Sequence, residues 1–407
     1  TSSRRQRQMC IRDSLYSVEE ETTGSLGGNI GYSDFGLMLG FNLQEQNFLG
    51  SGNTVGIGIN KSIYNEVYNI SFLDPYATKD AVSLGYNIYF RETDYGEFNI
   101  ANYLTNSAGF GAQFGYPISD TQRLSFNLTY DKTDIDIGSL PAREIYDFVA
   151  AEGNVFETLS AGVSWQTVTL NRGLFPTDGA STSLSLSTTV PGSDLSYYRI
   201  NLRQRYYQPL SSDLIFGFRG ELGYLSAYGE TEETPFFQNF YAGGPRSLRG
   251  FESNTLGPRS TDAPCYEFNY EEGTCPNLLD TDGDGELDSP YYNPYANNTS
   301  RYRDAPIGGN IKVEGSLQMI FRLPFIEDQR SMRSAFFFDF GNVFSDNCKD
   351  YQINCYKPSI DDLRYSYGVG ITWITGFGPM SFAISKPTNA GPQERTEEFQ
   401  FTVGNVF

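Results

Sequence analysis

The chain has 407 residues, of which 15% are aromatic and 42 are glycine, and it carries a formal net charge of −20 with no histidine. The absence of histidine excludes a Ser-His-Asp triad, a histidine metal site and a histidine pH switch. The acidic balance argues against nucleic acid as a partner, because the phosphate backbone repels negative charge.

The first residues differ from everything that follows. Residues 1–13 are basic and lack the apolar core of a secretion signal, so we interpret them as a non-native leader and leave them out of the fold. Residues 14–23, with their run of consecutive glutamates, are expected to form a linker. No apolar run reaches the roughly 18 residues of a membrane-spanning helix, so the sequence predicts none.

From Gly24 onward, apolar and polar residues alternate in segments of about ten residues. In residues 123–130, for example, Leu124, Phe126 and Leu128 share one face and polar side chains lie between them. Period two over this length predicts β-strands with one apolar and one polar side. We expect about sixteen strands, at residues 24–33, 35–43, 54–64, 66–74, 81–92, 103–116, 121–132, 158–170, 179–190, 196–208, 212–224, 309–323, 331–344, 364–375, 378–386 and 397–406.

A soluble β-sandwich would show the same alternation, so other features must decide the fold. The segments approach the roughly 9–11 residues of a tilted membrane strand, and aromatic residues such as Tyr86 and Tyr224 crowd their ends. Some connections are short, such as Ser33-Asp34, and others are long, such as 225–308, a rhythm typical of periplasmic turns and external loops. We therefore predict an all-β fold, a 16-stranded antiparallel transmembrane β-barrel over residues 24–407.

The long connection 225–308 contains a motif rich in glycine and aromatic residues, which predicts a loop packed against other structure. The motif residues are Gly243, Gly244, Leu248, Arg249, Gly250 and Phe251. The paired glycines precede a proline and predict a tight reversal. Arg249 needs a carboxylate if it is withdrawn from water, and the alternative is an arginine on a solvated loop.

Strand alternation proposes two partners for Arg249. Three phenylalanines share one face of residues 336–340, so Asp339 points into the lumen, and the apolar face of residues 311–321 places Glu314 inward as well. A guanidinium can be bidentate to one carboxylate and still bond a second. The alternative is that both acids line a hydrated lumen without binding the loop.

The five cysteines consist of two close pairs and Cys10. The pairs Cys265–Cys275 and Cys348–Cys355 lie in polar, loop-like sequence and predict two local disulfides in an oxidising compartment. Free thiols or a metal site remain the alternative.

An acidic run in the long connection has the spacing of a calcium loop. Its carboxylates are Asp280, Asp282, Asp284, Glu286 and Asp288. Tyr291 occupies the twelfth position, where an EF-hand has glutamate, so the alternative is a solvated acidic loop. No cofactor is expected beyond this candidate structural Ca²⁺.

Several motifs resemble those of the BamA family, the outer-membrane insertases of Gram-negative bacteria. The matching segments are residues 171–179, 190–198, 236–259, 336–343 and the C-terminal strand. The resemblance implies that residues 14–23 end the last of several periplasmic POTRA domains, and that the loop arginine docks on carboxylates aligned with Asp339 and Glu314. It implies insertion of client β-barrels, together with assembly-complex lipoproteins, periplasmic chaperones and lipopolysaccharide as partners.

The first and last strands would meet at the seam of the barrel, and both contain glycine, which weakens strand interiors. The seam residues are Gly24, Gly27, Gly28, Gly31, Phe399, Phe401, Gly404 and Phe407. A weak seam exposes backbone groups that can pair with a third strand, and the alternative is that these glycines only permit curvature. No catalytic motif is present, so we expect no enzyme. The alternative functions are a two-partner-secretion pore of the same superfamily and a passive porin.

Overall fold

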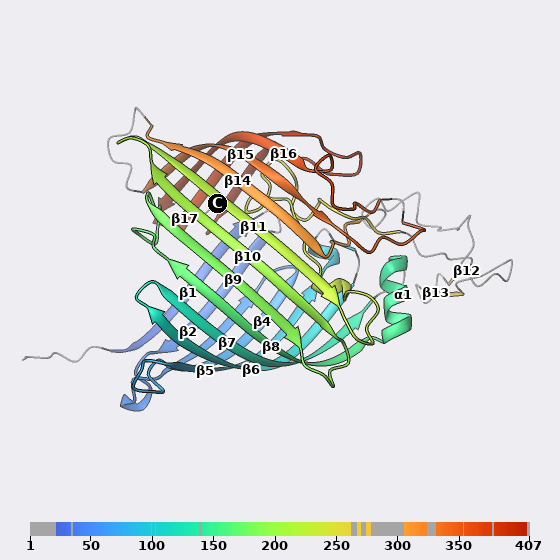
Figure 1. Cartoon of the computed structure of the whole chain (residues 1–407), viewed down its shortest axis with the longest axis horizontal. Helices are drawn as coiled ribbons and strands as arrows, with labels where there is room; N and C mark the ends of the chain where they lie inside the picture. The colour runs from blue at the N-terminus through green and yellow to red at the C-terminus, as the bar shows by residue number, and fades with distance from the viewer. Residues whose placement is uncertain are drawn as a thin grey trace, which may run out of the picture.

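The structure, a computed structural model, describes residues 22–33, 36–98, 100–101, 103–137, 141–261, 267–269, 274–277, 305–323, 331–352, 354–376 and 378–404. Sixteen strands close into one antiparallel barrel (Figure 1). They are β1 (Gly24–Ser33), β2 (Gly36–Glu45), β3 (Thr54–Lys61), β4 (Asn65–Asp74), β5 (Ser83–Asp94), β6 (Leu104–Ser119), β7 (Gln122–Asp136), β8 (Val155–Val168), β9 (Gly179–Thr189), β10 (Tyr197–Pro209), β11 (Leu214–Ala227), β14 (Ile311–Phe321), β15 (Met332–Phe344), β16 (Arg364–Thr375), β17 (Gly378–Thr388) and β18 (Phe399–Val403). The predicted fold is confirmed.

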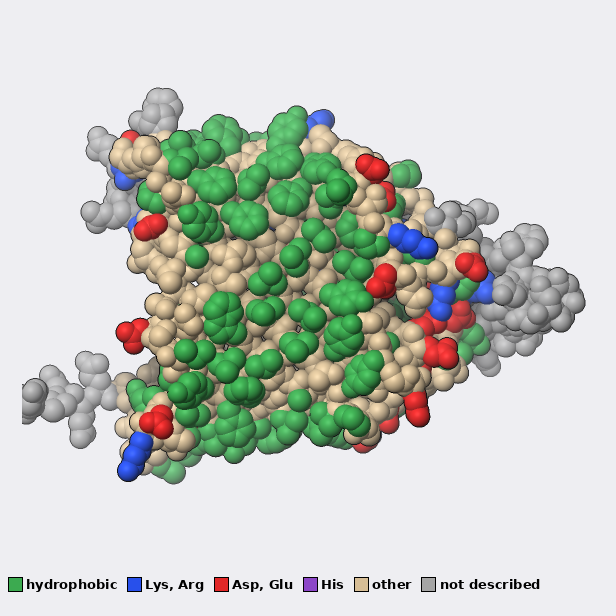
Figure 2. Space-filling view, in the orientation of Figure 1, with side chains coloured by type: hydrophobic (Ala, Val, Ile, Leu, Met, Phe, Trp, Pro, Cys, Tyr) green, Lys and Arg blue, Asp and Glu red, His purple; other side chains and the backbone are tan. Residues whose placement is uncertain are grey.

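The alternation along each strand places apolar side chains on the outside of the barrel. Ile88 and Leu128 are 57% and 46% exposed, although both sit in the middle of long strands. Figure 2 shows hydrophobic side chains spread over the face of the barrel in view, with acidic and basic groups gathered toward its two ends. A surface of this kind matches the apolar band of a transmembrane barrel.

Strand direction corrects one sequence-based inference. The strands alternate in direction around the barrel, so the connections after β1 and β11 leave from the same end. The short link at Ser33-Asp34 and the long loop therefore lie at the same end of the barrel. Short and long connections are thus not separated strictly between the two ends. The loop itself runs over 228–310, because β11 continues to Ala227 and β14 begins at Ile311.

Several strand bounds differ from the prediction, and one helix was not predicted. The last strand, β18, spans Phe399–Val403 within the described residues, which is shorter than the predicted 397–406. A helix that the period-two pattern does not predict, α1 (Arg143–Glu152), follows β7 at the long-loop end (Figure 1). Ile145 and Phe148 form its buried face, and Gly153, with φ +95°, ends it. Within the described residues no helix is long and apolar enough to cross a bilayer.

The external loops pack together into a cap at the end where α1 lies. Phe148 of α1, Phe156 of β8 and Phe236 of the long loop belong to one buried aromatic cluster. The ring centroids of Phe148 and Phe236 are 5.4 Å apart in an edge-to-face arrangement, which is favourable for aromatic pairs. The other short elements in the loops are η1 (Phe48–Gly50), η2 (Gly96–Phe98), η3 (Phe236–Gln238), β12 (Glu267–Asn269) and β13 (Thr274–Asn277).

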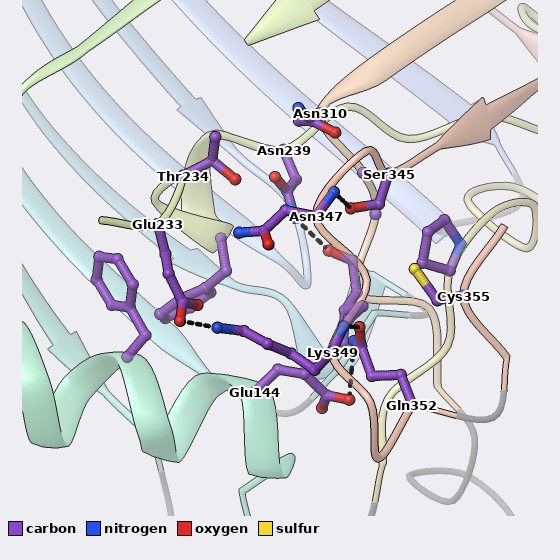
Figure 3. A pocket seen from close by; sticks show the side chains of 16 residues that line it. Glu144, Glu233, Thr234, Asn239, Asn310, Ser345, Asn347, Lys349, Gln352 and Cys355 are labelled. Atoms are coloured by element: carbon purple, nitrogen blue, oxygen red, sulfur yellow. Dashed lines mark hydrogen bonds and ion pairs between the residues drawn. The ribbon is translucent and has the colours of Figure 1, made fainter. Parts of the chain in front are cut away.

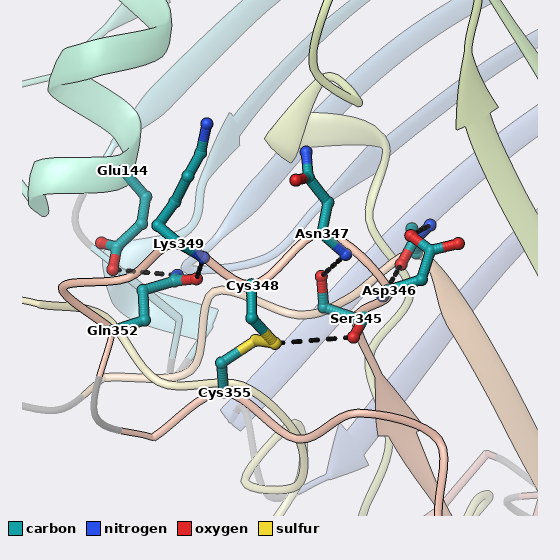
Figure 4. Close-up of a disulfide and its surroundings, with 9 residues drawn as sticks. Glu144, Ser345, Asp346, Asn347, Cys348, Lys349, Gln352 and Cys355 are labelled. Carbon is teal, nitrogen blue, oxygen red and sulfur yellow. Dashed lines mark hydrogen bonds between the residues drawn. A yellow bond between two sulfur atoms is a disulfide. The ribbon is translucent and has the colours of Figure 1, made fainter.

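A disulfide between Cys348 and Cys355 closes the loop that follows β15 and faces α1 (Figure 4). Gln352, inside this disulfide loop, donates a 3.0 Å hydrogen bond to Glu144 of α1. Lys349 reaches Glu233 of the long loop across a small cavity of about 60 Å³ (Figure 3). These contacts join three separate loops into one cap.

Candidate functional site: the lumen loop and the barrel seam

The glycines of the lumen loop adopt conformations that other residues rarely reach. Gly243 and Gly244 have φ values of +104° and +99°. A Cβ on Gly243 would lie 2.5 Å from the carbonyl oxygen of Glu252, which is closer than real contacts allow. The backbone N–H of Gly244 bonds the carbonyl oxygens of Leu248 and Phe251, so the reversal folds the loop onto itself. The paired glycines therefore shape the tip that carries Arg249.

Arg249 is bound to the inner wall of the barrel. Its Nε and one terminal nitrogen each donate to Asp339, both at 2.8 Å, and its backbone N–H donates to the same carboxylate at 3.1 Å. It also donates to Ser316 Oγ at 3.0 Å, and its guanidinium carbon lies 3.4 Å from the ring centre of Phe337. Arg249 is 2% exposed and Asp339 is fully buried. This is a bidentate, buried ion pair with a cation–π contact.

Glu314 contacts the same loop two residues earlier. Ser247 Oγ donates to Glu314 Oε1, and Lys312 forms an ion pair with the other oxygen at 3.1 Å. The structure thus brings Glu314 and Asp339 to one loop, with Asp339 bonded directly to Arg249. That Glu314 is a second carboxylate partner of Arg249 stays a prediction.

The apolar residues of the motif are the second anchor. Leu248 and Phe251 have no exposed surface and pack with Leu225, Phe240 and Val343 in one cluster. Burying side chains of this size contributes about 1.5–3 kcal/mol each. The loop is thus held by hydrophobic packing as well as by charge.

The same loop is tied to the last strand of the barrel. The side chain of Gln400, in β18, accepts a bond from the Gly250 N–H at 3.2 Å and donates to the Phe251 carbonyl at 2.8 Å. The N–H of Glu397, just before β18, donates to the Gly250 carbonyl at 2.9 Å. Gln400 is 1% exposed, so water does not compete for these bonds. The loop therefore positions β18 from inside the lumen.

The seam between β1 and β18 is short. On one side, β1 pairs with β2 along its whole length, from Gly24 opposite Glu45 to Ser33 opposite Gly36. On the other side, the described residues contain a single pair, Tyr32 opposite Val403. The neighbouring β17–β18 pairing runs from Met380↔Val403 to Ile384↔Phe399. The closure of the barrel is thus its least paired junction within the described residues.

Backbone contact at the seam involves two glycines. Gly404 has φ +81°, and a Cβ there would lie 3.2 Å from the Cα of Gly31. Glycine at both positions lets the two strands approach closely at this point.

The other predicted seam residues occupy different positions. Gly24, Gly27 and Gly28 lie in β1 and pair with β2. Phe399 is 57% exposed on the outer face of β18, and the ring of Phe401 lies 4.8 Å from that of Phe382 of β17 in a tilted arrangement. Phe407 lies outside the described residues.

Two predicted sites in the long loop cannot be placed. Cys265 and the side chain of Cys275 lie outside the described residues, as does the acidic run from Asp280 to Asp288. The calcium site and the first disulfide therefore stay predictions. The described residues contain no group of three or more acidic or cysteine side chains arranged for a metal.

Sequence reasoning did not identify three of the contacts that complete the site. Gln400 alternates with Phe399 and Phe401, so an inward polar residue could have been found on the last strand. Ser316 likewise shares the inward face with Glu314. Ser247 lies in irregular backbone, where no periodic pattern shows which way a side chain points.

Comparison with known proteins agrees with this geometry. An Omp85 superfamily domain matches residues 47–407. The outer membrane protein assembly factor BamA of Neisseria meningitidis serogroup B is 29% identical over 418 residues, covering 96% of this chain and 48% of that protein. The sorting and assembly machinery component 50 homolog of Homo sapiens is 22% identical over 373 residues, covering 89% of this chain and 68% of that protein.

Solved structures show the same relationship. The crystal structure of BamA from Haemophilus ducreyi lacking POTRA domains 1–3 superposes with a TM-score of 0.78 at 27% identity, covering 95% of this chain and 70% of that one. CdiB from Escherichia coli, at 11% identity and a TM-score of 0.52, shares the fold. The chain spans about half the length of the Neisseria relative. The chain belongs to the Omp85 superfamily, and its sixteen strands form a bacterial outer-membrane barrel similar to that of BamA.

Proposed function

We propose that this barrel folds and inserts client outer-membrane β-barrels by adding strands at the seam between β1 and β18. The observation that carries the proposal is the edge of β1. Residues Gly24–Gly31 pair with β2 on one side and with no described residue of β18 on the other. An edge of this kind presents free N–H and C=O groups, which form a template for an incoming strand.

The lumen loop would give the seam one fixed side. Because the loop bonds Asp339 of β15 and Gln400 of β18, it braces the C-terminal wall, while β1 is joined to β18 by a single pair within the described residues. An incoming strand would therefore displace β18 from β1 without disturbing the rest of the barrel. The expected partners are nascent outer-membrane barrels, assembly-complex lipoproteins, periplasmic chaperones and lipopolysaccharide.

The test locks the seam with a disulfide. Tyr32 and Val403 are directly opposite, so Tyr32→Cys with Val403→Cys should cross-link the strands. The control is Ile30→Cys with Leu39→Cys, which cross-links β1 to β2 and leaves the seam free. Client insertion would be measured in proteoliposomes with and without reductant, alongside the parent protein, whose own disulfide also responds.

The proposal expects the oxidised seam variant to lose insertion and to regain it on reduction, while the control inserts clients in both states. Full insertion by the cross-linked seam variant would exclude strand addition at this seam. A translocation pore works through the lumen, so transport that survives the cross-link would favour the secretion-pore function instead.

A further inference from the structure

A cavity of about 360 Å³ lies in the lumen beside the loop, and arginines dominate its lining. Four arginines and two glutamates contribute charged groups: Arg203, Arg205, Arg219, Arg246, Glu221 and Glu314. β10 and β11, adjacent strands at the centre of Figure 1, supply four of the six. Their register places Arg205 directly opposite Arg219, a like-charge pair that destabilises a sheet unless something compensates it.

The two glutamates are already engaged by other cations. Glu221 accepts a 3.1 Å bond from Arg203 and lies 3.5 Å from Lys312. Lys312 also pairs with Glu314 at 3.1 Å. Four arginines thus line the cavity with two carboxylates that Lys312 also contacts, while Asp339 outside the lining interacts with Arg219.

Three of the arginines keep unused donors. Arg219 donates to the Ser247 carbonyl oxygen at 2.9 Å, and the nearby carboxylates of Asp339 and Glu314 offset part of its charge. Arg205 and Arg246 lie within 4 Å of no carboxylate in the part of the chain that the structure describes. These three side chains come from β10, β11 and the lumen loop, and all three line the same cavity.

We propose that this cavity binds a phosphate-type oxyanion, coordinated by Arg205, Arg219 and Arg246. Guanidinium groups present planar pairs of N–H donors that match phosphate oxygens. The cavity also has hydroxyls from Ser181 and Ser183, which can donate to the same oxygens. A tetrahedral anion accepts bonds in several directions, which suits donors that converge from three elements.

The anion would bridge the loop to β10 and β11 of the barrel wall. Arg246 lies three residues before Arg249, so the bound anion would hold the loop at a second charged point. The residues of this site lie on β9, β10, β11 and the lumen loop, and none of them lies on β1 or β18.

The test is calorimetric titration of the purified full barrel in a zwitterionic detergent with inorganic phosphate, repeated with glycerol 3-phosphate as the lipid-headgroup fragment. The test variant is Arg205→Gln with Arg246→Gln. The control is Arg91→Gln, which removes an exposed arginine from β5 outside this cavity. We expect saturable phosphate binding that weakens at least about tenfold in the test variant, a loss of about 1.4 kcal/mol, and is unchanged in the control.

A second measurement tests whether the variants still fold. Phosphate should raise the melting temperature of the parent and the control but not that of the test variant, which should still show the heat-modifiable mobility of a closed barrel. Tighter binding of glycerol 3-phosphate than of phosphate would identify a lipid headgroup as the source, and the reverse would identify the free anion. Absence of saturable binding to the parent, or equal binding by the test variant, would overturn the proposal.

Discussion

The side-chain amide of Gln400, in the last strand, donates to the carbonyl oxygen of Phe251, in the lumen loop, across 2.8 Å. Both residues are buried, and the same amide group also accepts from Gly250. The position of the terminal strand therefore depends on a loop that begins more than a hundred residues earlier in the chain.

Gln400→Leu should loosen β18 without unfolding the barrel. The change keeps the size of the side chain but leaves buried backbone groups of the loop unpaired, at a cost of about 1–3 kcal/mol. Hydrogen exchange of residues 399–403 should accelerate by about ten-fold or more, given that 1.4 kcal/mol corresponds to a factor of ten. Gln113→Leu, at an exposed glutamine of β6, is the control and should exchange like the parent.

Asp339→Asn should be among the most damaging single changes to the site. It leaves Arg249 buried without its counter-charge, and breaking such a pair costs about 3–5 kcal/mol. The melting temperature and heat-modifiable mobility of the barrel should fall, measured beside Arg249→Gln and the double variant. The double variant should lose less than the sum of the single variants, since it removes both charges; strict additivity would show that the two residues do not interact.

Gly404→Val should force the seam apart. The new Cβ would meet the Gly31 Cα at 3.2 Å, and valine is strained at a φ of +81°. Cross-linking between cysteines at positions 32 and 403 should slow in this variant. Gly376→Val is the matched control, because its Cβ would meet nothing within 4 Å. Unchanged cross-linking in Gly404→Val would show that the seam accommodates the added side chain and that its closure does not require glycine at this position.

The external cap should be more stable at acidic than at neutral pH through Glu144. Burial raises the pKa of this carboxyl, partly offset by bonds from the Thr261 N–H and Gln352. A carboxyl whose pKa is raised on folding contributes stability that is complete below its unfolded pKa and is lost as pH rises through the folded pKa. Protection factors of residues 143–152, corrected for intrinsic exchange, should therefore fall from pH 4.5 to 7.5, and Glu144→Gln should flatten this dependence. An equal decline in the variant would assign it to other groups.

The barrel was predictable because a membrane strand repeats every two residues over its whole length. Residues 364–375 form β16 within the predicted bounds, and the inward direction of Asp339 followed from the phenylalanines beside it. α1 was missed because its apolar positions, Ile145 and Phe148, cover only one short stretch between two strands. Its stability comes from aromatic contacts with the long loop, which no local pattern encodes.

The seam was only partly predictable. Its glycines could be identified in the sequence. The stagger that puts Tyr32 opposite Val403, however, depends on how all sixteen strands tilt and shift around the barrel. The arginines of the lumen cavity fell on inward positions of β10 and β11, yet their convergence with Arg246 required the path of the loop.

That stagger has a consequence for exchange between strands. Under the proposed strand addition, an incoming strand would first pair with Gly24–Gly31 of β1, one residue after another, before it contacts β18. The incoming strand would then displace β18 by breaking one residue pair, Tyr32 with Val403. The length of this stretch of β1, more than the strength of the Tyr32–Val403 pair, would determine how readily a client strand begins to pair.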